Sequence, residues 1–170
     1  FLDDVFNRDH RKIVVIDGRI AYTGGMNIAD YYIKGTERVG SWHDMHCRIS
    51  GEEVNTLQRI FVRMWELTTG RGIDETGLYH GGQDISYFNG LKPDTCGSAG
   101  QKMVGIINRE PHTTNKIIRQ FYLDAINDAH DSIKIINPYF TLSPRLMRAL
   151  KKAVKRGVKV EILLSVKSDI

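Results

Sequence analysis

Cysteines and long apolar runs are scarce in this sequence, and each scarcity excludes a class of protein. The 170 residues include only two cysteines, Cys47 and Cys96, which form neither a disulfide framework nor a paired metal-binding spacing and so favour a reducing compartment. No apolar run approaches the roughly 20 residues that cross a bilayer as a helix. Hydrophobic residues make up 41% of the chain and charged residues 26%, which is typical of a folded globular protein and not of a disordered one.

Neither sign of charge dominates strongly. The net charge is +4 at pH 7 and the isoelectric point is about 9.1, which suits an anionic partner without deciding between a lipid headgroup, a nucleic acid and a nucleotide. The chain starts at Phe1 and stops at Ile170 without a capping pattern. We therefore expect it to be an internal portion of a longer protein, and to be soluble by itself.

The first 70 residues predict a hairpin, a strand and a helix. Residues 12–16 and 19–23 are rich in β-branched side chains and are joined by Asp17-Gly18, a strong signal for a type I′ turn. Residues 44–50 predict a further strand. The stretch from Gly51 to Gly70 has apolar residues at helical spacing and acidic residues in its first turn, so it predicts an amphipathic helix.

The second half of the chain predicts alternating strands and helices. Residues 70–102 contain eight glycines and few periodic apolar residues, so we interpret them as a connector between lobes or a functional loop. The elements expected beyond it are strands at 103–108, 132–137 and 158–164 and helices at about 113–130 and 143–156. This alternation predicts an α/β fold with a mixed β-sheet flanked by helices. The expected organisation is one lobe at 1–69, the connector at 70–102 and a second lobe at 103–170.

The hairpin brings together residues that could hold a phosphate. Residues two apart in a strand face the same side, about 6.6 Å apart, so His10 and Lys12 project together. A two-residue loop would place Gly25 opposite His10, with Asn27 as the diagonal neighbour. An ammonium, an amide and an imidazole would then meet above a glycine. Asp17 lies roughly 20 Å of extended chain from His10, so its expected role is to hold the turn.

These residues resemble a known signature. The sequence HRK at 10–12, Asp17 and the sequence GGMN at 24–27 match the HxKxxxxD…GGxN pattern, or HKD motif, of the phospholipase D superfamily. The flanking sequences, SWHDMHCRISGEEVNTLQRIFVRMW and NPYFTLSPRLMRALKKAVKRGVKVEIL, resemble bacterial cardiolipin synthases. The resemblance extends over nearly the whole chain.

The resemblance implies a phospholipase D-like fold and a phosphatidyl transfer without metal ion or cofactor. One phosphatidylglycerol would donate its phosphatidyl group to a second, through a phosphohistidine, to give cardiolipin and glycerol. Carried across by position, His10 and Lys12 are catalytic and Asp17 is the structural member of the motif. Gly24, Gly25 and Asn27 would cradle the phosphate. Asp44 occupies the position of an acidic residue that binds the catalytic histidine.

The chain departs from this pattern in one respect. Superfamily members of this type carry two HKD motifs on two lobes, whereas no second H-x-K with a following aspartate occurs beyond the connector. We therefore expect this chain to contain the end of a first lobe and the truncated start of a second lobe. The complete second lobe of the same polypeptide is expected to complete the active site. We expect the fragment to be inactive alone, and the parent to act on the anionic surface of the bacterial cell membrane with its catalytic part facing the cytoplasm.

Several alternatives stay open. His43, Asp44, His46 and Cys47 suggest a metal site, but His43 and His46 have opposite parity in a strand, so we expect no metal there. The basic residues of the helix at 143–156 are expected to form a solvated face, with attraction to anionic lipid as the alternative. Rival functions are a nuclease or other phosphodiesterase of the superfamily and a non-catalytic lobe that binds anionic lipid. A nucleic acid partner is not expected, because a platform of interleaved aromatic and basic residues is missing.

Overall fold

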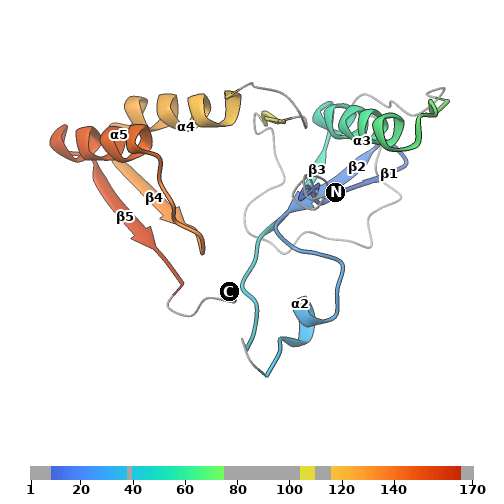
Figure 1. Cartoon of the computed structure of the whole chain (residues 1–170), viewed down its shortest axis with the longest axis horizontal. Helices are drawn as coiled ribbons and strands as arrows, with labels where there is room; N and C mark the ends of the chain where they lie inside the picture. Colours follow the sequence, from blue (N-terminus) through green and yellow to red (C-terminus); the bar gives the residue numbers. More distant parts are fainter. Residues whose placement is uncertain (1–8, 38–39, 75–103, 110–115, 166–170) are drawn as a thin grey trace, which may run out of the picture. The chain divides into compact units, whose positions relative to one another are not determined.

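The chain divides into two compact units, Phe1–Ile106 and Ile107–Ile170. The computed structural model describes residues 9–37, 40–74, 104–109 and 116–165. Figure 1 shows that each unit has its own β-strands with helices packed beside them. Each unit is described by itself below.

The first unit is a three-stranded antiparallel sheet covered by one long helix (Figure 1). Its strands are β1 (Ile13–Ile16), β2 (Ile20–Gly24) and β3 (His46–Ser50), with β2 in the centre. The long helix is α3 (Glu53–Thr69), and a single helical turn, α2 (Tyr31–Lys34), lies between β2 and β3 in the sequence. The hairpin, the strand before Gly51 and the amphipathic helix are therefore confirmed, while α2 was not predicted.

The core of the first unit lies between α3 and one face of the sheet. The helix contributes Val54, Leu57 and Ile60, and the sheet contributes the fully buried Ala21. Further apolar side chains pack around this cluster; they are Ile13, Val15, Ile49 and Ile106. The face of the sheet that carries Ile13, Ala21 and Ile49 is therefore the one turned toward α3.

The hairpin has the predicted turn but not the predicted register. Asp17 and Gly18 have φ values of 53° and 62°, and the Arg19 amide donates to the Ile16 carbonyl at 3.0 Å, as a type I′ turn requires. Ile16 nevertheless pairs with Ile20 and not with Arg19. The predicted pairing was wrong by one residue. Arg19 is accommodated as an extra residue, and this register places Val15 beside the buried Ala21 on the core face.

The second unit is a strand–helix–strand unit with an additional helix. Strands β4 (Ser132–Ile136) and β5 (Lys159–Leu163) are parallel, and helices α4 (Ile117–Asp128) and α5 (Pro144–Lys155) pack beside them. The buried residues are Ile126, Ala149, Leu150, Ala153 and Val158. The α/β fold class is confirmed, with an antiparallel sheet in one unit and a parallel pair in the other.

Caps and one arginine fix the ends of these helices. The Ser143 hydroxyl accepts from the Leu146 amide at 3.4 Å at the start of α5. Arg156 donates to the Ile126 carbonyl at 2.9 Å, which satisfies an otherwise unpaired acceptor near the end of α4. Arg156 therefore has a structural role, although the residue is exposed.

One predicted strand was wrong. Residues 104–108 have no regular structure, although Ile106 packs into the core of the first unit. Met103, most of the connector at 70–102 and the start of the helix predicted at about 113 lie outside the described residues. None of the described helices is both long enough and apolar enough to cross a membrane.

Candidate active site

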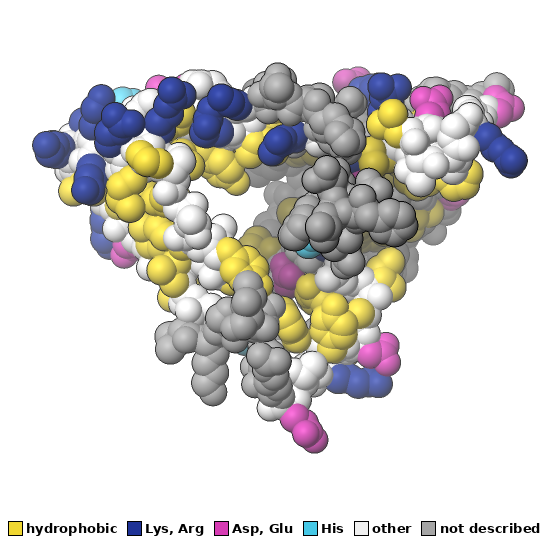
Figure 2. Space-filling view, viewed as in Figure 1, with side chains coloured by type: hydrophobic (Ala, Val, Ile, Leu, Met, Phe, Trp, Pro, Cys, Tyr) yellow, Lys and Arg dark blue, Asp and Glu magenta, His cyan; other side chains and the backbone are white. Residues whose placement is uncertain are grey.

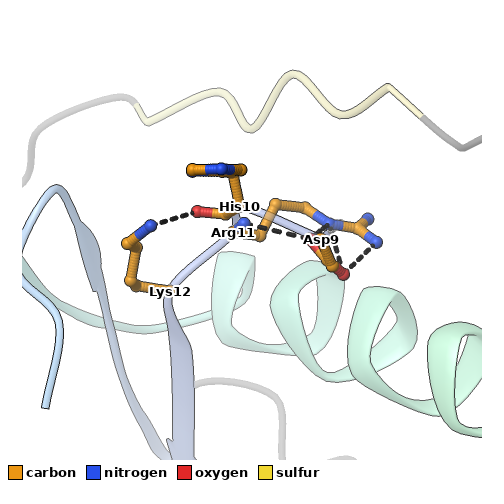
Figure 3. A network of polar contacts seen from close by, with 4 residues as sticks. All are labelled: Asp9, His10, Arg11 and Lys12. Atoms are coloured by element: carbon orange, nitrogen blue, oxygen red, sulfur yellow. Dashed lines mark hydrogen bonds and ion pairs between the residues drawn. The ribbon is translucent and has the colours of Figure 1, made fainter. Parts of the chain in front are cut away.

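His10 and Lys12 lie immediately before β1. The Lys12 ammonium donates to the backbone carbonyl of His10 at 2.7 Å, so its charge lies beside the His10 main chain (Figure 3). The His10 side chain is exposed and makes no hydrogen bond with any other described residue. A ring that is not hydrogen-bonded to the described residues can present a nitrogen to a substrate.

Asp9 and Arg11 form an ion pair on the opposite side of the His10 backbone from Lys12 (Figure 3). The Arg11 Nη2 lies 2.7 Å from Asp9 Oδ2, and the Arg11 Nε donates to Asp9 Oδ1 at 2.9 Å. The hydrogen bond from the Arg11 side chain lowers the pKa of the Asp9 carboxyl below its ordinary value. This pairing occupies the guanidinium of Arg11, which leaves Lys12 as the cation beside His10.

Asn27 is hydrogen-bonded to a residue of α2. Its amide donates to the Tyr32 hydroxyl at 2.9 Å, and the Tyr32 ring stacks on Trp42 with their centroids 5.3 Å apart. Within the described ranges, no hydrogen bond joins Asn27 to His10 or Lys12. The expected convergence of the imidazole, the ammonium and the amide therefore stays a prediction.

The expected position of Gly25 opposite His10 was wrong. The last pair of the ladder is Ile13 with Thr23, and continuing that register places Lys12 level with Gly24. The physical cause is the extra residue in the hairpin connection, which shifts every partner by one position. His10 lies beyond the paired part of β1.

Gly24 and Gly25 allow the segment 44–46 to lie against the end of β2. A Cβ on Gly25 would overlap the Asp44 carboxylate, and a Cβ on Gly24 would overlap the Met45 carbonyl. The Gly25 amide donates to that same carbonyl at 2.9 Å. The two glycines thus have a steric role, because only residues without a side chain permit this approach.

Asp44 is held by its own neighbour. Its Oδ1 accepts from the Met45 amide at 2.7 Å, and its carboxylate lies against Gly25. No hydrogen bond joins Asp44 to His10 within the part of the chain that the structure describes. The proposed contact between Asp44 and the histidine stays a prediction.

Comparison with known proteins identifies the family. The family described as "Cardiolipin synthase, PLD-like domain" matches residues 122–170. A cardiolipin synthase of Geobacillus thermodenitrificans strain NG80-2 is 36% identical over 170 residues, which covers 99% of this chain and 32% of that protein. This chain resembles a fragment of the cardiolipin synthases, which are phospholipase D-like proteins.

Other cardiolipin synthases are similar over the same length. One from Staphylococcus aureus strain Mu50 is 38% identical over 163 residues, covering 96% of this chain and 31% of that protein. A cardiolipin synthase 2 of Staphylococcus epidermidis strain RP62A is 36% identical, also over 163 residues. The chain spans about a third of the length of the curated relatives it matches. No solved structure matches this cardiolipin synthase-like chain.

The sequence of this cardiolipin synthase-like chain suggests a role for His46 only as a possible metal ligand. His46 pairs with Gly24 across the sheet, and its Nδ1 is buried without a hydrogen-bond partner in the described part of the chain. Only the pairing of β2 with β3, which the sequence did not specify, could have drawn attention to it. The described residues contain no group of three or more histidine, cysteine or acidic side chains placed to hold a metal ion.

Proposed function

We propose that the protein carrying this chain transfers the phosphatidyl group of one phosphatidylglycerol to another, giving cardiolipin and glycerol. The observation that carries the proposal is an HKD-type motif in a chain that is 36% identical to a cardiolipin synthase over nearly all of its length. The exposed imidazole of His10, with the Lys12 ammonium bound to the His10 main chain, is consistent with attack on a phosphodiester.

The proposed reaction proceeds in two displacements at phosphorus. An imidazole nitrogen of His10 attacks the phosphodiester, a P–N bond forms, and the P–O bond to glycerol breaks. A second histidine protonates the departing oxygen and later removes the proton from the hydroxyl of the second phosphatidylglycerol, which displaces His10. Lys12 neutralises charge that develops on the phosphate oxygens.

The other motif residues are proposed to support this chemistry. Asp17 holds the turn, in which its φ is positive. Gly24 and Gly25 let Asp44 approach, and Asp44 orients the His10 ring when the site is complete. Asn27 would have to exchange its Tyr32 partner for a phosphate oxygen to bind substrate.

We propose that the second histidine comes from a second lobe of the same polypeptide. In this assignment residues 1–69 are the end of the first lobe, 70–102 are the connector, and 103–170 are the start of the second lobe. The length of the relatives, about three times that of this chain, leaves room for the second motif.

The proposed substrate surface is an anionic membrane, with the site facing the cytoplasm. The basic residues of α5 are all exposed and form part of the Lys and Arg surface in Figure 2; they are Arg145, Arg148, Lys151, Lys152 and Lys155. Basic residues close to an anionic leaflet gain about 1 kcal/mol each. Near the motif, Ile28 and Ile33 are 96% and 83% exposed, which offers apolar contact to acyl chains.

The test uses a polypeptide that carries this chain and a second lobe. Given phosphatidylglycerol as the only lipid, it should form cardiolipin and glycerol in equal amounts. His10→Ala should reduce the rate by at least about 1,000-fold, because the nucleophile is lost. The matched control is His130→Ala, since His130 is exposed and lies outside the motif. Equal rates for His10→Ala and the parent, or cleavage of a nucleic acid in place of lipid transfer, would contradict the proposal.

A further inference from the structure

Gly24 lies between two polar residues on one face of the first unit's sheet. His46 on β3 is paired with Gly24, and continuing the register of β1 by one residue beyond its last pair places Lys12 level with Gly24 on the other side. Directly paired residues project from the same face. This face is opposite to the one that carries Ile13 and Ala21 against α3. Because strands are about 4.8 Å apart, the backbones of Lys12 and His46 are separated by about 10 Å, with only a glycine between them.

The His46 ring leans over this glycine. A Cβ on Gly24 would lie 2.9 Å from His46 Nδ1 and 2.7 Å from His46 Cα. The Nδ1 atom is buried and has no hydrogen-bond partner among the described residues, whereas the residue as a whole is partly exposed. The inner edge of the ring is therefore closed to solvent.

The burial of Nδ1 selects a tautomer. Buried N–H groups without an acceptor are rare in native proteins, whereas under-satisfied acceptors are somewhat commoner. The neutral ring should therefore carry its proton on Nε2. In this state His46 offers a hydrogen-bond donor at its outer edge, on the same side of the sheet as Lys12.

We propose that His46 is a phosphate-binding residue, whose Nε2–H donates to a non-bridging oxygen of a phosphate held between it and the Lys12 ammonium. His46 is neither nucleophile nor base in this role, since Nδ1 is enclosed and Nε2 is already protonated. The inference rests on the proposed function only for the identity of the phosphodiester. The anion site itself depends on the geometry around Gly24.

The first test is the tautomer, measured by NMR on the 170-residue chain with nitrogen-15-labelled histidine. At a pH where His46 is neutral, the protonated nitrogen should be Nε2. A proton on Nδ1 would overturn the proposal, because the ring would then present a lone pair to a phosphate anion.

The second test is a titration of the same chain with inorganic phosphate. Glutamine places an amide N–H near the position of Nε2, whereas asparagine places one near Nδ1. His46→Gln should bind phosphate within about three-fold of the parent chain, while His46→Asn and His46→Ala should bind about ten-fold more weakly. Equal affinity in all four chains, or no phosphate binding by the parent chain, would overturn the proposal.

The third test separates binding from a structural role in the two-lobe polypeptide. His46→Asn should reduce phosphatidylglycerol transfer about ten-fold while its unfolding midpoint stays close to that of His46→Gln. Loss of transfer in both variants, together with a lowered unfolding midpoint, would indicate a purely structural residue and contradict the proposal. If the polypeptide makes no cardiolipin but phosphate binding follows the glutamine and asparagine pattern, the proposed function fails and this inference stands.

Discussion

At the scale of single residues, the glycines of the motif determine where Asp44 lies. Gly25→Ala would place a Cβ within the volume of the Asp44 carboxylate, which would have to move. We expect transfer by the two-lobe polypeptide to fall at least about ten-fold, since small displacements of a site residue are costly. The matched control is Gly105→Ala, because a Cβ at Gly105 meets no atom within 4 Å. Full activity in Gly25→Ala would contradict the steric role.

The Asp9–Arg11 pair gives a pH dependence with a definite sign. The Arg11 hydrogen bond lowers the pKa of folded Asp9, so the pair stabilises the fold above the ordinary carboxyl pKa and loses this contribution as the pH falls through the lowered value. Because the pair is at the surface, its contribution should be no more than about 1 kcal/mol. The urea midpoints of the parent and Asp9→Asn should therefore differ slightly at pH 7 and converge below about pH 4. A difference that grows on acidification would contradict this sign.

At the scale of helices and strands, local signals predicted most elements. The Asp17-Gly18 turn, α3 and α5 were recognisable because their caps, glycines and apolar spacing lie within a few residues of one another. The register of β1 on β2 was not recognisable from the sequence, because it depends on which residues are buried against α3. Residues 104–108 contribute Ile106 to a core but have no strand partner among the described residues. Alternation in the sequence cannot distinguish a paired strand from an irregular segment that buries one apolar side chain.

The candidate site was predictable to the same degree. His10, Lys12 and the two glycines follow from a motif with fixed spacing. The hydrogen bond of Asn27 to Tyr32 and the position of His46 beside Gly24 do not follow from the motif, because both contacts depend on the folded structure. A motif therefore names residues of a site, while their contacts depend on tertiary structure.

Helix α5 carries the prediction for membrane attraction. Lys151→Gln with Lys155→Gln should weaken binding to vesicles that contain anionic lipid about ten- to thirty-fold, since each charge is worth about 1 kcal/mol near the surface. The control is Lys134→Gln, an exposed lysine on β4. Vesicles of neutral lipid should bind neither the parent chain nor the double variant appreciably. Unchanged affinity of the double variant for anionic vesicles would assign these lysines to a solvated face only.

At the scale of the whole molecule, the chain holds one motif where the proposed reaction needs two histidines. We expect the purified 170-residue chain to show little or no transfer from phosphatidylglycerol, because no second motif supplies the general acid. Thin-layer separation of the lipid products measures this directly. Turnover at the rate of the two-lobe polypeptide would show that one motif is sufficient.

The central claim is that His10 carries the phosphatidyl group during transfer. The most direct measurement is mass spectrometry of the two-lobe polypeptide, quenched within one turnover of phosphatidylglycerol and digested. We predict a phosphatidyl adduct on the peptide that contains His10, formed as glycerol is released and absent from His10→Ala. Cardiolipin formation with no adduct at His10, or with the adduct on another residue, would contradict the account.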